Sequence, residues 1–573
     1  MFTATKLQVA TYLLGVCPFS IAFLVFLNSS VSFVITDLIG KEDAVGDAVG
    51  TLGFADELVA LVACPLWGLL SDRMGLRPVC VAGYLIICLA LVLFVQAKNV
   101  YPQLLLARLF FSLGGAAAST MVTAILPAVA TPSTNYPAEN QRAGVAAAGN
   151  GHATSPSIES EVTITPARFV SRSSQRKSKV DLTAADSEIA GSTSRVAGFV
   201  GMFTGFGALI ALTLFLPLPA KFQYAGIGEK AALKDSFYIV AAVAFLLAIW
   251  CFFGLRRLHS DAEDYPSRSA VPRRNGAISR LTDALTQMLN NFQTAIMAGF
   301  QRSEIAIGYL GGFVARASSV GISLFIPLLV NATFLSSGLC VDPSSSDDPT
   351  GLPDIKRRCP RAYVVAAELT GVTELVALVF APVFGYWAAR ATRKEIPLLV
   401  ASMAGIIGYP LFANEFDPDD RNTSQRAAAF FAVCLIGISQ IGAIVCSLGT
   451  LSKGVLRREA RRPPNTSEHN GQGTDARLDE ESPLLTAIQQ GNAETPLSAL
   501  KGSVAGVYSL YGGAAILILT KVGGLLFDKV SLAGPFYIMA IFNATLMLAC
   551  LISSLLSSKE RATQPEPGPQ DGG

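Results

Sequence analysis

The sequence predicts an all-α membrane protein in which twelve transmembrane helices form two pseudo-symmetric six-helix bundles. Three observations lead to this prediction. Apolar residues make up 51% of the 573 residues and charged residues only 15%, whereas soluble domains average about 25% charged residues. Apolar runs of about twenty residues recur along the chain, and each is long enough to cross the hydrocarbon core of a bilayer as a helix. Finally, a segment of the first half recurs in the second half.

The composition also excludes several classes of protein. The 44 basic and 42 acidic residues give a net charge of +2, which argues against a broad basic surface for nucleic acid. Eight of the ten cysteines lie inside apolar runs, so a disulfide scaffold is not expected. The three histidines lie in polar segments, and the chain has no Gly-x-x-x-x-Gly-Lys-Ser/Thr loop. We therefore expect no metal site, no cofactor, no enzyme activity and no ATP hydrolysis.

The apolar runs place the twelve spans in chain order. The first run follows Lys6 and continues to about Ile39, which is too long for the apolar part of a signal peptide, so it is the first span. The predicted spans are residues 12–38, 49–70, 78–97, 102–129, 195–218, 235–255, 304–330, 362–387, 397–414, 427–451, 503–527 and 532–557.

Polar segments divide these spans into larger units. Residues 131–193, 257–302 and 452–500 are rich in polar and charged residues, and most of their length cannot bury a core. The expected units are an N-terminal six-helix bundle, a cytosolic linker, a C-terminal six-helix bundle and a disordered cytosolic tail. Their residues are 1–256, 257–302, 303–557 and 558–573.

Basic residues in the short loops predict the orientation in the membrane. Short cytosolic loops carry an excess of lysine and arginine, and three loops on one side do so here, whereas loop 41–47 on the other side is acidic. Both termini and all three long polar segments should therefore face the cytosol. The basic loop residues are Arg73, Arg77, Arg256, Arg257, Arg390, Arg393 and Lys394.

The linker is predicted to contain a helix from Ile278 to Phe300. Its apolar residues recur at helical spacing, with Leu281, Leu285 and Met288 on one face. Such a helix either lies on the bilayer surface or connects the two bundles.

An internal repeat indicates that the two bundles are related. Residues 57–68 match residues 374–385 at eight of twelve positions, which carries the second span onto the eighth. Two shorter sequence matches follow in the same order: Val196-Ala-Gly recurs from Val504, and Phe237-Tyr-Ile recurs from Phe536. Parallel repeats of this kind place a pseudo-two-fold axis along the membrane normal, with a substrate path between the halves.

The loop after the second span resembles the signature loop of the major facilitator superfamily, Gly-x-x-x-Asp-Arg-x-Gly-Arg-Arg. Its matching residues are Gly68, Asp72, Arg73, Gly75 and Arg77, whereas Leu76 replaces one arginine. Gly68 would allow close approach of another helix, Asp72 would face the positive end of a helix, and the arginines would anchor the cytosolic face. The second half keeps Gly385, Arg390 and Lys394 but has Ala389 in place of Asp72.

Two further spans carry weaker resemblance to the superfamily. Arg108 begins a stretch of the fourth span similar to the Arg-x-x-x-Gly-x-Gly-x-Ala pattern. The fifth span, with Gly198, Gly201, Gly205 and Gly207, resembles the glycine-rich motif of the drug:proton antiporter branch but lacks its proline. Glycines at this spacing also occur in plain helix packing. The resemblance implies the twelve-span fold and transport of a small organic solute by alternating access.

Ionisable residues within spans are costly to bury and therefore informative. Glu57 and Glu374 each lie eleven residues from the loop glycine of their repeat, which is about 16 Å of helix and near the middle of the bilayer. They are candidates for carrying protons, and the alternative is a structural hydrogen bond to a neighbouring helix. Asp56 is a further candidate on a different face of its helix.

Other polar residues of the spans are candidates for the substrate cavity. Arg316 in the seventh span is the preferred residue for an anionic substrate, because that span lines the cavity in the superfamily. Asn28, Tyr309 and Gln440 are additional candidates, although each is individually more typical of packing.

Several sequence features bear on the subcellular location of the protein. Cys340 and Cys359 lie in the non-cytosolic loop 331–361, where a disulfide could persist. Asn331 and Asn422 begin glycosylation sequons close to helix ends. Glu480, Leu484 and Leu485 resemble an acidic dileucine signal, which sorting adaptors recognise. With this signal, two locations are equally expected: a vacuolar or other endomembrane of fungal type, and the plasma membrane.

The sequence thus predicts a monomeric secondary active transporter that moves a small organic solute and couples its movement to protons. Its partners would be the solute, protons, the lipid bilayer and a sorting adaptor, without nucleic acid. Two alternatives are an uncoupled facilitator and a membrane receptor or scaffold on a transporter fold.

Overall fold

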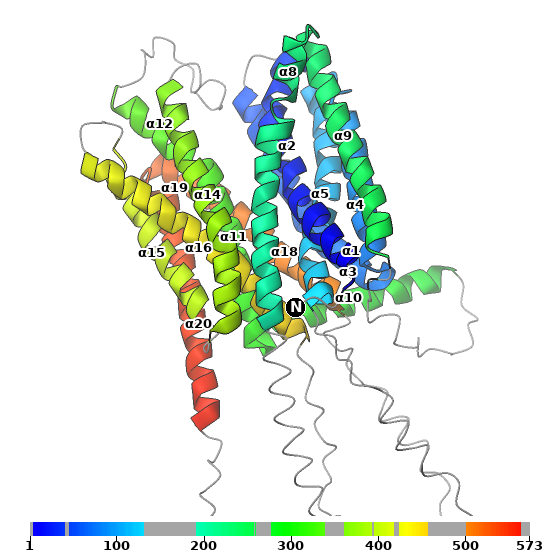
Figure 1. Ribbon diagram of the computed structural model, residues 1–573, viewed down its shortest axis with the longest axis vertical. Helices are drawn as coiled ribbons and strands as arrows, with labels where there is room; N and C mark the ends of the chain where they lie inside the picture. Colours follow the sequence, from blue (N-terminus) through cyan, green and yellow to red (C-terminus); the bar gives the residue numbers. More distant parts are fainter. Residues whose placement is uncertain are drawn as a thin grey trace, which may run out of the picture.

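The computed structural model describes residues 4–40, 45–130, 191–256, 258, 277–338, 360–391, 395–417, 423–456 and 500–562. Within these ranges the regular elements are all helical (Figure 1). Twelve of the described helices are long and apolar enough to cross a membrane, which confirms the predicted spans to within several residues at each end.

The first six spans come from the N-terminal part of the chain. Span 1 is Lys6–Ile39 and contains α1 (Lys6–Ala10) and α2 (Cys17–Phe33). The next three are α3 (Val45–Met74), α4 (Leu76–Phe94) and Val100–Ala130, whose main part is α5 (Leu105–Ala130). Span 5 is Gly191–Tyr224 and ends in α8 (Leu218–Tyr224), and span 6 is α9 (Glu229–Gly254).

The last six spans follow the linker helix α10 (Ala277–Gln301). Span 7 is Ser303–Ser336, with α11 (Ser303–Val320) and α12 (Ile326–Ser336). The following three are α14 (Pro360–Arg390), α15 (Ile396–Glu415) and α16 (Thr423–Leu456). Span 11 is Lys501–Lys529, with α18 (Lys501–Ile518) and α19 (Gly524–Lys529), and span 12 belongs to α20 (Gly534–Ala562).

The two halves pack their helices in the same way. In the first half α4 contacts α5 and α9, and α3 contacts α5; in the second half the corresponding α15 contacts α16 and α20, and α14 contacts α16. Aromatic side chains fill equivalent positions, since the rings of Phe94 and Phe237 lie 5.7 Å apart and those of Phe412 and Phe536 lie 5.5 Å apart. Phe237 and Phe536 begin one of the two shorter sequence matches, so the repeat is visible in the packing.

The start of the chain, the end of α20 and the linker helix lie at one end of the molecule, here called the linker end (Figure 1). Gly75 separates α3 from α4 at this end with a φ of 92°. That conformation strains residues with a side chain, whereas glycine adopts it readily. The tight turn of the signature loop therefore depends on this glycine.

The halves meet at the linker end through two seams of closely approaching helices. In the first, between α3 and α18, a Cβ atom added at Gly68 would lie 2.2 Å from the carbonyl oxygen of Gly502. In the second, between α14 and span 5, a Cβ atom at Gly385 would lie 2.6 Å from Cα of Gly198 and 3.0 Å from the carbonyl oxygen of Ser194. Neither seam has room for a side chain at these glycines, so their backbones are in direct contact.

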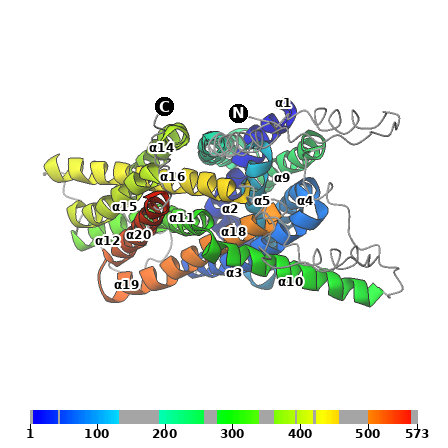
Figure 2. The ribbon, with the colours of Figure 1, turned by 90° about the horizontal axis from the view of Figure 1, so that it is seen from below.

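The helix α10 confirms the predicted linker helix. It lies across the linker end, beneath the spans (Figures 1 and 2), and contacts α3 of the first half as well as α11 and α18 of the second. Its contacts with both halves favour the connecting role. Leu289, Met297 and Phe300 remain largely exposed on it, so contact with the bilayer surface stays a prediction.

Several sequence predictions fall outside the described residues. These are the disulfide of Cys340 and Cys359, the sequon at Asn422, the sorting signal of Glu480, Leu484 and Leu485, the loop residues Arg257, Arg393 and Lys394, and most of the polar segments 131–193 and 452–500 and of the tail. Asn331 is described, and it is buried within α12, which is unfavourable for glycosylation.

Valine substitutions test the dependence of the seams on glycine. Gly68→Val and Gly385→Val should each lower the free energy of unfolding by about 1–3 kcal/mol, because the added side chains meet backbone that cannot yield. Gly53→Val in α3 and Gly371→Val in α14 are matched controls, since nothing lies within 4 Å of a Cβ atom at either position. Thermal unfolding of the purified proteins gives the comparison, and equal losses in both pairs would contradict the role of the seams.

Cysteine labelling tests the orientation. Tyr224 is 92% exposed at the opposite end from the linker, and Met74 is 51% exposed at the linker end. In sealed vesicles with the cytosolic face inside, an impermeant thiol reagent should label Tyr224→Cys at once and Met74→Cys only after permeabilisation. The reverse pattern would place the linker end outside the cytosol.

Candidate functional site

A buried ion pair fixes three helices of the first half to one another. Arg108 in α5 is 3% exposed, and its Nη2 donates to Oδ2 of Asp56 in α3 and to Oδ1 of Asn28 in α2, each at 2.5 Å. The hydroxyl of Ser112 donates to the backbone carbonyl of Asp56 at 2.8 Å. Asn28, Asp56 and Arg108 were all candidates from the sequence, and the structure brings them into one cluster. A buried arginine requires such an acidic partner, because an unpaired charge is costly away from water.

Next to this cluster lies a cavity of about 90 Å³ between the two halves. Glu57 borders it from α3, as does the adjacent Asp56, although successive side chains of a helix point about 100° apart. Arg316 reaches it from α11 of the other half, and its Nη2 donates to Oγ of Ser119 in α5 at 3.4 Å. Gly512 in α18 leaves room for the Arg316 stem, because a Cβ atom there would lie 2.6 Å from Cγ of Arg316.

Two acidic residues of the first half, Asp56 and Glu57, and one basic residue of the second half, Arg316, therefore line the cavity. Asp56 is already paired with Arg108, whereas Glu57 and Arg316 both face the cavity. Serine hydroxyls add hydrogen-bonding groups around them. This set can bind a small polar molecule, and Glu57 can take up and release a proton. The serines that line the cavity are Ser20, Ser112, Ser119 and Ser509.

Glu374 lies in a different environment from its repeat partner Glu57. Its Oε1 accepts a hydrogen bond of 3.4 Å from Nε2 of Gln440, which also donates to Ser319 at 3.4 Å. The residues that line the cavity with Glu57 do not include Glu374 in the part of the chain that the structure describes. The repeat thus places the two carboxylates on equivalent helices with unlike neighbours, and their shared role in proton coupling stays a prediction.

Tyr309 lies apart from the cavity. It is 3% exposed, its hydroxyl donates to the carbonyl oxygen of Ala295 in α10 at 3.0 Å, and its ring stacks on Tyr511 at 5.3 Å. These contacts attach the linker helix to α11. A tyrosine in this place packs rather than faces a solute.

The signature loop has the geometry expected of it. Asp72 accepts hydrogen bonds from the backbone N–H groups of Gly502 and Ser503 at 2.5 and 2.6 Å, and from the hydroxyl of Ser503. These groups belong to the first turn of α18, so the prediction that Asp72 faces the positive end of a helix is confirmed. Arg73 is exposed at the same end, and the guanidinium of Arg77 lies 4.0 Å from the ring centre of Phe252.

Two contacts between the halves were not predicted from the sequence. Ser119 was not among the candidates, although it receives the guanidinium of Arg316. Lys521 was not among them either, and its Nζ lies 4.0 Å from the ring centre of Phe54 in α3. Both contacts join residues far apart in the chain, and no local pattern signals them.

Known proteins share this arrangement of helices. Residues 19–149 match the family model of the Major Facilitator Superfamily. The human organic anion transporter MFSD10 (TETRAN) aligns over 95% of this chain and 99% of its own, with a TM-score of 0.50 and 11% identity. The proton:xylose symporter XylE aligns over 95% of this chain and 94% of its own, with a TM-score of 0.51 and 12% identity. The chain has the major facilitator fold.

The major facilitator fold and the twelve apolar helices make the chain an integral, multi-pass membrane protein. Among curated proteins, none matches the chain in sequence. The similar structures therefore inform the fold of this chain, and its chemistry has to be argued from its own residues. In this fold the cavity of Glu57 and Arg316 lies between the two bundles.

Single and double substitutions test the buried ion pair. Asp56→Asn and Arg108→Gln should each lower the free energy of unfolding by about 3–5 kcal/mol, because each leaves a buried charge without its partner. The double variant should lose much less free energy of unfolding than the sum of the two single losses, as measured by thermal unfolding in detergent. The pair of Glu304 and Lys453, whose side chains are 19% and 24% exposed, is the control and should show a coupling of about 1 kcal/mol or less. Additive losses at Asp56 and Arg108 would contradict the pairing.

Proposed function

We propose that the protein is a secondary active transporter that moves a small organic solute across a membrane by alternating access and couples this movement to protons. The observation that carries the proposal is the cavity between the halves, bordered by Glu57 from one half and Arg316 from the other. A solute held between two groups on opposite halves is released on either side as the halves rock.

The two seams supply the moving contacts of this cycle. Access from the linker end requires Gly68 to separate from Gly502 and Gly385 from Gly198. It also breaks the hydrogen bonds that Asp72 accepts from the first turn of α18. Backbone contacts of this kind form and break as units, which suits two discrete conformations.

The groups of the cavity indicate the class of solute. Arg316 can hold an acidic group of a solute through its planar guanidinium, and Glu57 can hold a proton or a basic group. The similar structures are described as an organic anion transporter and as a proton:xylose symporter, which agrees with a small organic solute. Two glycines of span 5 are explained by packing, because Gly198 meets Gly385 and a Cβ atom at Gly207 would lie 1.9 Å from the carbonyl oxygen of Pro18. The similarity to the drug:proton antiporter branch therefore adds little.

Glutamine substitutions test the proton coupling. Glu57→Gln or Glu374→Gln should reduce solute accumulation driven by a pH gradient to the background level, because glutamine cannot exchange a proton. Counterflow exchange requires only binding and rocking, and it should largely persist. Both are measured in proteoliposomes, with solutes chosen by comparing the metabolites of cells that lack and overproduce the protein.

The same assay separates the alternatives. Glu229→Gln, at the exposed start of α9, is the matched control and should transport normally. Uptake that ignores the pH gradient in the unmodified protein would indicate an uncoupled facilitator, and no uptake of any solute would favour a receptor or scaffold. Normal accumulation in the double variant of Glu57 and Glu374, at equal protein level, would exclude both carboxylates as proton carriers.

A further inference from the structure

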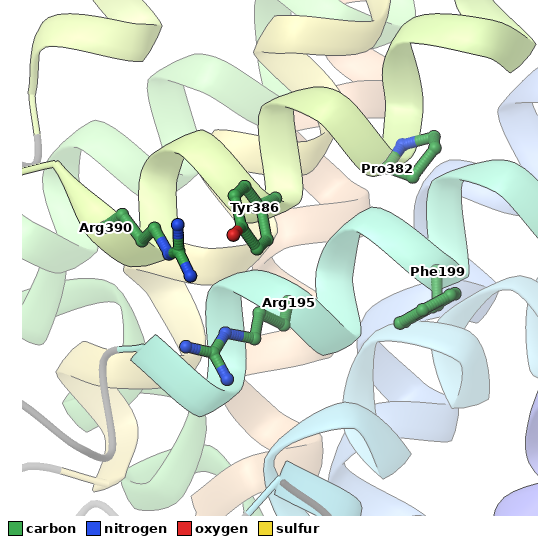
Figure 3. Close-up of a pocket in the computed structure, with 5 residues that line it drawn as sticks. All are labelled: Arg195, Phe199, Pro382, Tyr386 and Arg390. Carbon is green, nitrogen blue, oxygen red and sulfur yellow. The ribbon is translucent and has the colours of Figure 1, made fainter.

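A second pocket lies at the linker end, outside the cavity of the proposed transport cycle. It has a volume of about 400 Å³ and lies between span 5 and α14, the helices of the second seam. Arg195 and Phe199 line it from span 5, and Pro382, Tyr386 and Arg390 line it from α14 (Figure 3). The guanidinium of Arg390 lies 4.2 Å from the ring centre of Tyr386. Two cations from opposite halves thus flank one apolar pocket.

The repeat explains why this pocket is unusual. Gly68 and Gly385 occupy equivalent positions in the repeat. Gly502 and Ser194 are also equivalent, because the carbonyl oxygen of Gly502 lies against Gly68 and that of Ser194 lies against Gly385. Extending this correspondence along the helices pairs Asp72 with Ala389 and Ser503 with Arg195.

The first seam places a carboxylate where the second has none. There Asp72 accepts hydrogen bonds from Ser503 at the start of α18. In the second seam the carboxylate is replaced by the methyl group of Ala389, and the hydroxyl of Ser503 is replaced by the guanidinium of Arg195. Among the described residues, none with a carboxylate lines the pocket. Within the described part of the chain, the second seam therefore keeps an arginine, Arg390, at the position of Arg73, adds Arg195 and lacks a carboxylate.

We propose that the phosphate of an anionic phospholipid supplies this anion. The pocket opens to the surroundings of the bundle, where Arg195 and Arg390 are exposed and Tyr386 is 50% exposed. It lies at the ends of two spans, at the level of lipid headgroups, on the side that the loop arginines assign to the cytosol. Arginine binds phosphate in a two-pronged geometry, and the cytosolic leaflet is rich in anionic lipids. The apolar side chains of Phe199, Pro382 and Tyr386 would contact an acyl chain.

The bound lipid has a conformational consequence. Its phosphate bridges Arg195 of one half and Arg390 of the other, next to the contact of Gly198 with Gly385. It therefore binds the conformation in which the linker end is closed and stabilises that conformation by mass action. The first seam achieves the same closure with Asp72, which is part of the chain, whereas the second depends on the membrane.

Lipid titration of the purified full-length protein tests the proposal. Native mass spectrometry should show one phosphatidylglycerol binding in preference to phosphatidylcholine. Arg195→Gln with Arg390→Gln should weaken that binding about 30-fold, as expected for roughly 1 kcal/mol per arginine near an anionic surface. The matched control is Lys221→Gln with Lys230→Gln, which removes two exposed charges at the opposite end and should bind as the unmodified protein does. Equal binding by the arginine and lysine variants would overturn the proposal, as would equal binding of both lipids.

A substitution that restores the missing carboxylate gives an independent test. Ala389→Asp should remove the preference for phosphatidylglycerol while keeping the folded state, because its carboxylate takes the place of the phosphate. Ser71 in the first seam is 2% exposed in this closed conformation, so protection of Ser71→Cys from a thiol reagent reports closure of the linker end. Phosphatidylglycerol should increase this protection in the Ser71→Cys protein, and the protection should no longer respond to the lipid when Ala389→Asp is added. A lipid response that persists with Ala389→Asp would contradict the site. Displacement of phosphatidylglycerol by millimolar inorganic phosphate would identify a free anion rather than a lipid as the ligand.

Discussion

Direct contact between glycine backbones at the linker end is the constraint on which the rest of the structure depends. Within a membrane, apolar side chains gain little by moving from lipid to a helix interface, so helices associate where their backbones approach closely. Gly68 against Gly502 and Gly385 against Gly198 provide two such contacts, one on each seam. They hold the halves together at one end, and they bring Glu57 and Arg316 to the borders of one cavity. A side chain on any of these glycines would alter the whole interface.

The repeat conserves packing and lets the chemistry diverge. The contacts of α3 with α5 recur as those of α14 with α16, and Phe237 and Phe536 occupy equivalent aromatic clusters. The polar residues differ, because Glu57 faces a basic residue of the other half whereas Glu374 accepts a hydrogen bond from Gln440 within its own half. Packing constrains every helix pair of both halves, while the proposed solute site needs only one set of polar groups.

The fold was predictable because its signals are local in sequence. A span must satisfy its backbone hydrogen bonds internally, so an apolar run of sufficient length is a helix, and the eight-of-twelve match between residues 57–68 and 374–385 revealed the two halves. The position of Asp72 at a helix start was predictable from its motif. The partners of Arg108 were not, because Asn28 and Asp56 lie 80 and 52 residues away. Tyr309 was predicted to line the cavity. Its position in the seventh span alone could not show that α10 would cover it.

The fixed and the moving charges of the proposed cycle are separated between the halves. Arg108 and Ser112 hold Asp56 through its side chain and its backbone carbonyl, so the adjacent Glu57 keeps its position within the first half. Arg316 belongs to α11 and moves with the second half. When the halves rock, the distance between Glu57 and Arg316 changes, and with it the electrostatic stabilisation of an ionised Glu57. Proton binding and conformation are then linked, and linkage acts in both directions. The proposed coupling therefore needs no relay of residues, because it follows from placing an anchored carboxylate on one bundle and its cation on the other.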